Sequence, residues 1–340
     1  MRELAGELLR GQEAWVVGGA VRDELLGRRV VDLDIACREP REAARAYARR
    51  SGGSAFPLSE RHGAWRVALE EERTVDFTPL RGKIGADLAT RDFTLNAIAV
   101  PLAGGDPVDP FGGRTDLERR IIRAVGATIF TDDPLRLLRA VRLEDELRFR
   151  LDPATEHGVR AHAELVTRPA GERILAELKR LSAGGFRRLD ELGLLGPLGG
   201  SVDRLDSLPE EPSDLLLAAV FGASLRRLPV SNALARFARM LLRAEPPAGD
   251  SPRQIHRFRR ATEPWAIEAL IYLGLPELRE PVLRARASQP AEPLLRGDEL
   301  GLPPGPAIGV VLARIEEEQA AGTISTREEA LELARRVWGS

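Results

Sequence analysis

The sequence predicts an α+β protein, in which an α/β part ending near residue 125 is followed by an all-α remainder. Short runs rich in β-branched and aromatic residues, bounded by glycine or proline, indicate strands at 15–17, 30–35, 65–69, 74–77 and 98–102. From Asp133 onward apolar residues recur at helical spacing, as in 134–147, 170–181, 214–225, 232–242, 262–273 and 307–319. Clusters of proline and glycine separate these segments. We therefore expect a mixed β-sheet with helices first, and helices alone thereafter.

The composition excludes several classes of protein. The 340 residues include 50 basic and 52 acidic side chains, a net charge of −2, which excludes a uniformly basic coat of the histone kind. A single cysteine, Cys37, excludes an intrachain disulfide framework, and the presence of only four histidines argues against a structural zinc site. No apolar run approaches the ~20 residues of a membrane helix, and the N-terminus does not read as a signal peptide. We expect a cytoplasmic protein without membrane contact.

The first predicted strand runs into a glycine pair, Gly18-Gly19, and then into a helix expected over 20–26. Glycines let backbone N–H groups approach a ligand closely, and a helix N-terminus favours an anion. Arg22, on the first helical turn, can reach the same anion. Gly19 and Arg22 are therefore candidate phosphate contacts, although a glycine pair is more often simply a turn.

The next predicted strand carries two carboxylates, Asp32 and Asp34. Residues i and i+2 of a strand point to the same face, about 6–7 Å apart. Two acids on one side of an apolar strand repel each other unless a cation lies between them, and a hard divalent ion such as Mg²⁺ suits oxygen ligands and phosphate chemistry. The alternative is a strand whose acids simply face solvent.

These segments together resemble a known family. The pattern Gly18-Gly19-x-x-Arg22-Asp23 followed by Asp32-x-Asp34 resembles motif A of the class II CCA-adding tRNA nucleotidyltransferases and bacterial poly(A) polymerases. Further segments resemble motifs B to E and the C-terminal region of that family, at 91–97, 109–126, 132–136, 171–178 and 296–309. The resemblance implies a nucleotidyltransferase head over 1–127, a helical neck for base recognition over 128–190, a body over 191–265, and an RNA-binding tail over 266–340.

The resemblance also implies roles for residues in the head. Asp32 and Asp34 would be the catalytic ligands of Mg²⁺, and Arg91 and Asp92 would contact the ribose. Some relatives carry a third carboxylate at the position of Asp76, which is otherwise an ordinary strand acid. Arg91 and Asp92 could instead form a surface ion pair. Another candidate nucleotide contact, with a local backbone cap as the alternative, is Asn96.

In the neck, the resemblance assigns base recognition to Asp133 and Arg136, which offer an acceptor and donors to a Watson–Crick edge. Asp133 also precedes Pro134 and is a candidate N-cap. Arg139 and Arg142 continue the spacing of three, and no acid lies between residues 134 and 143. We therefore predict that these arginines contact nucleotide phosphates and bases rather than solvent.

The implied activity is template-independent addition of C, or of C and A, to the 3′ end of tRNA from CTP and ATP, with release of pyrophosphate. Only nine residues, 78–86, separate the strand at 74–77 from the approach to motif B, where full CCA-adding enzymes generally have a longer loop. The short segment resembles the CC-adding subgroup, and the choice between the two activities stays open. A poly(A) polymerase is an alternative. A catalytically silent RNA-binding relative is a third reading, against which the intact acids argue.

A basic stretch follows in the helical part. Residues 225–260 contain nine arginines and two acids, a pattern that suits an RNA phosphate backbone. The resemblance implies recognition of the acceptor and T arms of tRNA by their shape. The alternative is a merely arginine-rich composition. Candidate RNA contacts are Arg226, Arg227, Arg236, Arg239, Arg257, Arg259 and Arg260, whereas we expect the acidic runs at 70–72 and 316–318 to be solvated.

Overall fold

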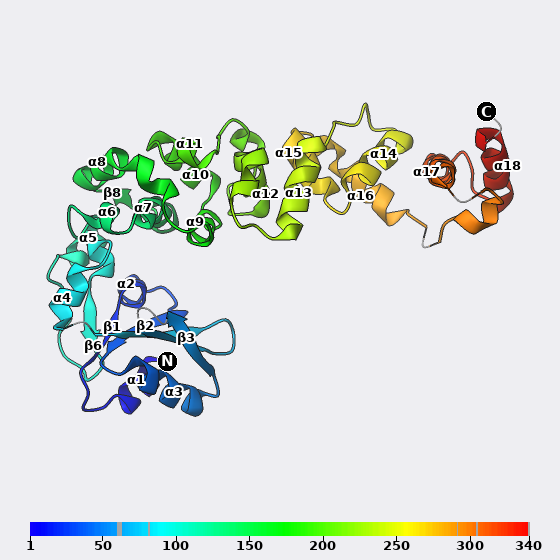
Figure 1. Cartoon of the computed structure of the whole chain (residues 1–340). Helices are drawn as coiled ribbons and strands as arrows, with labels where there is room; N and C mark the ends of the chain where they lie inside the picture. Colours follow the sequence, from blue (N-terminus) through cyan, green and yellow to red (C-terminus); the bar gives the residue numbers. More distant parts are fainter. Residues whose placement is uncertain (60–62, 81, 291, 304, 339–340) are drawn as a thin grey trace. The chain divides into compact units, whose positions relative to one another are not determined.

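The computed structural model describes residues 1–59, 63–80, 82–290, 292–303 and 305–338. The chain divides into two compact units, Met1–Leu198 and Gly199–Ser340 (Figure 1). The first unit contains the β-sheet and the second is helical, which confirms the predicted α+β class. The finer division into head, neck, body and tail remains a prediction.

A six-stranded mixed sheet forms the centre of the first unit, in the order β3-β4-β5-β2-β1-β6. Strands β2 and β5 are parallel and the other neighbours are antiparallel. The strands are β1 (Ala14–Val17), β2 (Asp32–Cys37), β3 (Ser54–Ser59), β4 (Ala64–Ala68), β5 (Thr74–Pro79) and β6 (Ala99–Pro101). The sequence predicted all of them except β3. That strand contains Pro57 and lies at the edge of the sheet, where a missing N–H is tolerated.

Helices α1 (Arg2–Leu8) and α3 (Pro40–Ser51) lie together, and α3 packs against β4 and β5. The Tyr47 and Phe77 rings are 5.8 Å apart, and the Arg45 guanidinium lies 5.3 Å from the Trp65 ring. Since side chains alternate along a strand, the neighbours Arg66 and Asp76 point to the opposite face. We call this opposite face the carboxylate face. Helix α4 (Ile84–Ala89) packs on another part of it, in a cluster with Val17 and Ala36.

The rest of the first unit is mostly helical. The strands β7 (Ile121–Ile122) and β8 (Arg150–Leu151) form a parallel pair, and between them in the sequence lies the long helix α7 (Leu135–Leu147). This helix packs against α9 (Gly171–Leu178) and α10 (Ala183–Glu191). Helix α7 begins at Leu135, and its N-cap is Pro134 rather than Asp133, which was expected there. Asp133 precedes the N-cap and accepts the Leu135 N–H at 3.3 Å. The other elements are α2 (Gly19–Leu25), η1 (Thr94–Asn96), α5 (Gly113–Arg119), α6 (Ile129–Asp132), α7 (Leu135–Leu147), α8 (Pro153–Ala161), η2 (Ala163–Thr167), α9 (Gly171–Leu178), α10 (Ala183–Glu191) and α11 (Leu195–Leu198).

The second unit contains only helices among its described residues. Ser213, Ser231 and Ser251 cap three of them by accepting backbone N–H groups of the first turn. None of the helices in the described part of the chain has the length and apolar character needed to cross a bilayer. The elements are η3 (Leu205–Ser207), α12 (Asp214–Phe221), η4 (Gly222–Arg227), α13 (Asn232–Arg243), α14 (Pro252–Thr262), α15 (Ala266–Leu273), η5 (Pro276–Leu278), α16 (Arg279–Ala287), η6 (Gly297–Leu300), α17 (Pro306–Ala320) and α18 (Arg327–Trp338).

Candidate active site

Two acids of the carboxylate face, Asp34 and Asp76, lie side by side on the neighbouring strands β2 and β5. In the parallel register of β2 and β5, Asp34 is opposite Asp76 and Asp32 is opposite Thr74. Asp32 is exposed and accepts a hydrogen bond from Thr74 Oγ1 at 2.7 Å. Asp76 is held by Arg66 of β4, which donates to both carboxylate oxygens at 2.7 Å. Asp76 therefore already has a cation partner, and its role as a third metal ligand remains a prediction.

The glycine turn approaches Asp34 at Gly18 rather than at Gly19. Gly18 has a φ of 72°, in the left-handed region that favours glycine. A Cβ at this position would lie 2.8 Å from Arg91 Nη1 and 3.2 Å from Asp34 Oδ2. Gly18 thus allows the chain to pass between the motif A acid and the motif B arginine.

The electrostatic environment of Asp34 is suited to a cation. Burial raises the pKa of Asp34 to about 6, and the Asp76 and Asp32 carboxylates raise it further, while Arg91 and Arg139 lower it. Asp34 is thus a partly buried carboxylate whose ionisation the two arginines do not fully compensate. Among the described residues there is no cluster of three or more metal-ligating side chains. The pair Asp32 and Asp34, with only oxygen donors, fits a hard divalent ion that takes its remaining ligands from water or phosphate.

A cavity of about 350 Å³ has the size of a small-molecule site. Asp32, Asp34 and Asp76 do not line it, but Arg91 and Arg139, which lower the pKa of Asp34, do. Ala64 and Thr78 contribute to its wall from the carboxylate face of the sheet, and α7 contributes from the other side. Five residues predicted from the sequence line this cavity together: Arg91, Asp92, Asp133, Arg136 and Arg139.

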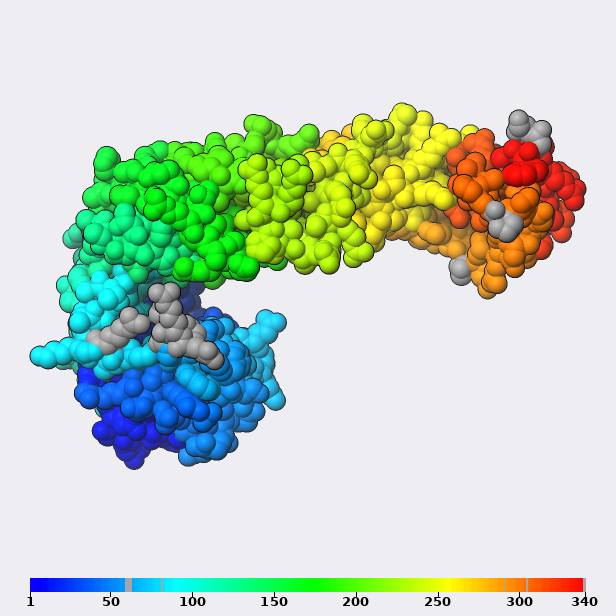
Figure 2. All heavy atoms as spheres, in the orientation of Figure 1, coloured from blue at the N-terminus to red at the C-terminus, as the bar shows by residue number. Residues whose placement is uncertain are grey.

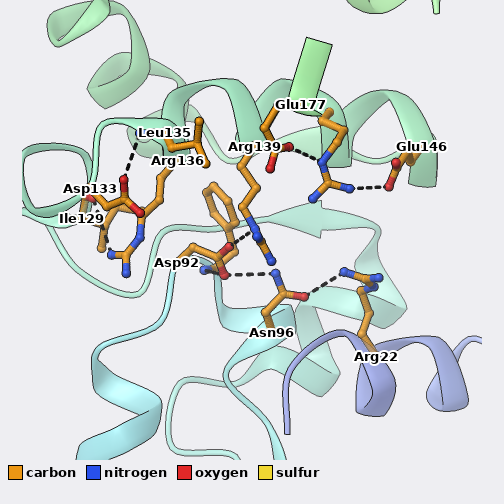
Figure 3. A network of polar contacts seen from close by, with 12 residues as sticks. Arg22, Asp92, Asn96, Ile129, Asp133, Leu135, Arg136, Arg139, Glu146 and Glu177 are labelled. Atoms are coloured by element: carbon orange, nitrogen blue, oxygen red, sulfur yellow. Dashed lines mark hydrogen bonds and ion pairs between the residues drawn. The ribbon is translucent and has the colours of Figure 1, made fainter. Parts of the chain in front are cut away.

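The polar residues of the cavity are held by one another (Figure 3). Asp92 is buried, accepts the Phe93 N–H at 2.8 Å, and forms an ion pair with Arg139 Nε at 2.5 Å. Burial opposes the ionisation of Asp92, but Arg139, the Asn96 amide and the Phe93 N–H lower its pKa below the usual value. Asp92 is therefore a fixed anion in the wall of the cavity.

Asp133 is positioned by a residue for which the sequence analysis proposed no role. Arg173 of α9 donates to both Asp133 oxygens, at 2.8 and 3.3 Å. Arg136 donates to the Thr90 carbonyl at 2.7 Å. The one sign in the sequence that Arg173 belongs to the site is its place in the segment that resembles motif E. Asp87, which pairs with Arg91 at 3.2 Å, had no such signal.

Four predicted nucleotide contacts lie outside the cavity wall: Gly19, Arg22, Asn96 and Arg142. Arg142 is 4% exposed and is paired with Glu146 and Glu177. A spacing of three residues turns by −60° per step around a helix, so Arg142 lies about 120° from Arg136. Arg22 is buried, pairs with Asp23 at 2.9 Å, and donates to Asn96 Oδ1 at 2.9 Å.

Asn96 joins these groups into a polar chain that runs from α2 to α7 (Figure 3). Its amide oxygen accepts from Arg22, and its nitrogen donates to Asp92 at 3.0 Å. Asp92 in turn pairs with Arg139. With an exposed fraction of 2%, Asn96 connects protein groups in this structure, and direct contact with a nucleotide remains only a prediction.

We expect Asn96→Ala to lower the free energy of unfolding by about 1–3 kcal/mol, since it leaves buried Arg22 and Asp92 each without one partner. Urea denaturation followed by circular dichroism measures this loss. Asn232→Ala, at the exposed start of α13, is a matched control with little expected effect. An equal loss in the two variants would contradict the connecting role of Asn96.

The basic stretch separates into two parts. On α14, Arg257 and Arg260 pair with Glu317 and Glu316 of α17, and Arg253 pairs with Glu318 at 2.5 Å. The α14 and α17 segments, yellow and orange, lie side by side (Figure 2). The expectation that the acidic run at 316–318 is solvated is wrong for Glu317 and Glu318, which are buried because they face these arginines.

The remaining predicted RNA contacts differ in exposure. Arg259 is buried and donates to Glu263, Gln289 and the Ala285 carbonyl. On η4 and α13 the candidate arginines are exposed, and within the described residues none of them has an ion-pair partner: Arg226, Arg227, Arg236 and Arg239. Arg236, Arg239 and the neighbouring Arg243 recur at helical spacing, opposite the buried Phe237 and Leu241. We call this face of α13 the arginine face.

The sequence and structure match known proteins. The poly A polymerase head domain matches residues 14–85 and 70–123. A CC-adding tRNA nucleotidyltransferase of Geobacter sulfurreducens is 35% identical over 94% of this chain and 91% of its own. An A-adding tRNA nucleotidyltransferase of Deinococcus radiodurans is 34% identical over 95% of both chains.

Solved structures show the same fold. The complex of a CCA-adding enzyme with CTP has a TM-score of 0.81 at 22% identity, covering 100% of this chain and 95% of that one. The Thermotoga maritima CCA-adding enzyme complexed with tRNA has a TM-score of 0.76 at 23% identity, covering 99% and 94%. With relatives above 30% identity along nearly the whole chain, this protein belongs to the class II tRNA nucleotidyltransferase family, together with the CC-, A- and CCA-adding enzymes.

Proposed function

We propose that the chain is a tRNA nucleotidyltransferase that adds C residues to the 3′ end of tRNA from CTP and releases pyrophosphate. The proposal rests on two acids of the carboxylate face, Asp32 and Asp34, and on the cavity lined by Asp133 and Arg136, since Arg91 and Arg139 line that cavity and also act on the charge of Asp34. The first group suits phosphoryl transfer, and the second suits the reading of a base edge.

The acids are proposed to hold a divalent cation, specifically Mg²⁺. Bound by Asp32 and Asp34, it would activate the RNA 3′-hydroxyl and stabilise the leaving pyrophosphate. Arg91 faces Asp34 across Gly18 and would donate to the triphosphate. The Asp92 carboxylate would accept a hydrogen bond from a ribose hydroxyl, and its ion pair with Arg139 holds that side chain in the cavity wall.

Base choice is proposed to rest on Asp133 and Arg136. Cytosine presents an amino donor beside ring acceptors, so the carboxylate would accept from the amino group while the guanidinium donates. Uracil presents a carbonyl in place of the amino group and would meet the Asp133 carboxylate with like polarity. Adenine also combines an amino donor with a ring acceptor, so this pair alone does not exclude ATP.

We further propose the CC-adding specificity, because β5 ends at Pro79 and α4 begins already at Ile84. Incubation of the protein with tRNA lacking its last three nucleotides, and each labelled nucleotide, tests this. Two C residues without A are expected. Addition of A after the two C residues would indicate a CCA-adding enzyme. Addition of A only to tRNA that already ends in CC would indicate an A-adding enzyme, and long A tails would indicate a poly(A) polymerase. No incorporation with intact RNA binding would indicate a silent relative.

The cytoplasmic location of the protein remains a prediction.

The arginine face is proposed to bind tRNA through its acceptor and T arms. We expect the double variant Arg236→Gln/Arg239→Gln to weaken tRNA binding and to reduce the slope of log K against log salt by up to about 2, one unit per lost phosphate contact. Filter binding at several salt concentrations measures the slope.

The control is Arg257→Gln/Arg260→Gln, which removes the same charge from arginines already paired with α17. Its slope is expected to change less. Equal slopes for the two double variants would contradict the assignment of RNA binding to the arginine face.

A further inference from the structure

The carboxylate face of the sheet continues beyond the acids to an aromatic side chain at its edge. The strand register places Asp34 opposite Asp76, Asp76 opposite Arg66, and Arg66 opposite Phe56. Directly opposite residues point to the same face, so these four side chains form one row across β2, β5, β4 and β3. With neighbouring strands ~4.8 Å apart, Phe56 lies about 14 Å from Asp34.

Phe56 is exposed although it is aromatic. Its exposed fraction is 42%, and it is the one exposed aromatic side chain among the described residues of the first unit. Leu58 of the same strand is also exposed, and a few exposed apolar residues are common at a protein surface and need no explanation by themselves. What distinguishes Phe56 is its position at the end of a row that leads to the proposed metal ligands.

Arg66, the neighbour of Phe56 in the row, retains a donor. Its Nε and Nη2 atoms donate to Asp76. The third nitrogen, Nη1, has no hydrogen-bond partner in the described part of the chain, and the side chain is 34% exposed. An aromatic ring and a guanidinium N–H are thus adjacent on an accessible face.

This pair of groups fits single-stranded RNA. Unpaired bases stack on aromatic rings irrespective of sequence, and arginine donates to the phosphates between them. The 3′-hydroxyl of the RNA substrate has to reach Asp32 and Asp34, at the other end of the row. Stacked nucleotides advance ~3.4 Å each, so roughly four of them, or fewer in an extended strand, span 14 Å.

We propose that Phe56 and Arg66 form a binding site for the unpaired 3′ end of the RNA substrate, in which Phe56 stacks on a base and Arg66 Nη1 donates to a phosphate. This inference rests on the proposed function, since it takes an RNA 3′ end as the group that is extended. It adds to that function a site for the acceptor strand on β3 and β4, the second of which also contributes Ala64 to the nucleotide cavity.

The test compares two RNA hairpins, one with a few unpaired nucleotides at its 3′ end and the same hairpin with a blunt end. Wild-type protein is expected to bind the first more tightly. Phe56→Ala should lose roughly 5- to 100-fold in affinity for it, with little change for the blunt hairpin. Phe56→Trp, which keeps an aromatic face, should retain the preference, whereas Phe56→Leu, which keeps only apolar bulk, should not.

An unchanged preference in Phe56→Ala would overturn the proposal, and so would equal rescue by leucine and tryptophan. Sedimentation that shows wild-type self-association lost in Phe56→Ala would instead assign the edge of β3 to a second copy of the chain. Thermal melting checks that each variant is folded. These measurements need no catalysis, so they are separate from the outcome in which wild-type protein adds no nucleotide to tRNA.

Discussion

Replacing Asp34 by asparagine is expected to abolish nucleotide incorporation and, at the same time, to stabilise the metal-free protein. The activity falls by roughly 10³-fold or more, because the loss of a metal ligand removes several kcal/mol of charge stabilisation in the transition state. The stability rises because the folded protein no longer contains a carboxylate that burial makes costly to ionise.

The direction of the stability change depends on pH. The pKa of Asp34 is about 6 in the folded protein and 3.8 for the unperturbed group, so its ionisation destabilises the folded state once the pH exceeds 3.8. The penalty reaches its full value above pH 6. Asp34→Asn should therefore gain about 1–3 kcal/mol at pH 7.5 and almost nothing near pH 4. Thermal melts in the presence of a chelator, across this pH range, measure the gain.

Asp32→Asn is the matched control. Asp32 is on the same strand and is also proposed to hold the metal, but its side chain is exposed. We expect it to lose activity with a much smaller gain in stability, because it removes only the repulsion of Asp34 by Asp32, which is the smallest of the effects that raise the pKa of Asp34. A similar stabilisation of the two variants would show that the effect is not due to the burial of Asp34. Retained incorporation in either variant would refute the metal assignment.

Asp133→Asn should redirect base choice from C towards U. An asparagine amide can donate to the uracil carbonyl that a carboxylate repels, so the preference for CTP over UTP should fall by roughly 10- to 100-fold, equivalent to 1–3 kcal/mol. The ratio of kcat/KM values for CTP and UTP, on tRNA lacking its last three nucleotides, measures the change.

The adjacent Asp132 is a matched control for this prediction. Its carboxylate accepts a hydrogen bond from Thr128 Oγ1 at 2.9 Å and does not line the cavity. Asp132→Asn should leave the ratio unchanged. If Asp133→Asn loses activity with both nucleotides equally, Asp133 positions the helix but does not read the base.

The predictable part of the site is the part that depends on local pattern. Alternation along β2 places Asp32 and Asp34 on one face, and the sheet register cannot separate them. The place of Asp133 at the start of α7 follows from the Pro134 that comes after it, although the N-cap itself is Pro134. These inferences need no knowledge of distant segments, which is why the sequence alone supports them.

Other features depend on which distant segment is nearby. The stripe of arginines on α7 is visible in the sequence, but Glu177 of α9 decides that Arg142 is paired inside the protein. Similarly, Arg22 donates a hydrogen bond to Asn96, and Arg173 donates to Asp133, which lies forty residues earlier in the sequence. Strand β3 was missed for a different reason, because the proline that argues against a strand is harmless at an edge.

The pairing of α14 with α17 constrains how the C-terminal part of such enzymes can be exchanged. Transplanting α17 into a relative that lacks arginines at the facing positions would take Arg253 and Arg257 away from Glu317 and Glu318, and would leave them Arg314 of α17 itself. Buried carboxylates that lose part of their ion pairing are costly to keep ionised. We therefore expect α14 and α17 to be exchanged best together, because a chimera whose breakpoint lies between 262 and 306 separates these ion pairs.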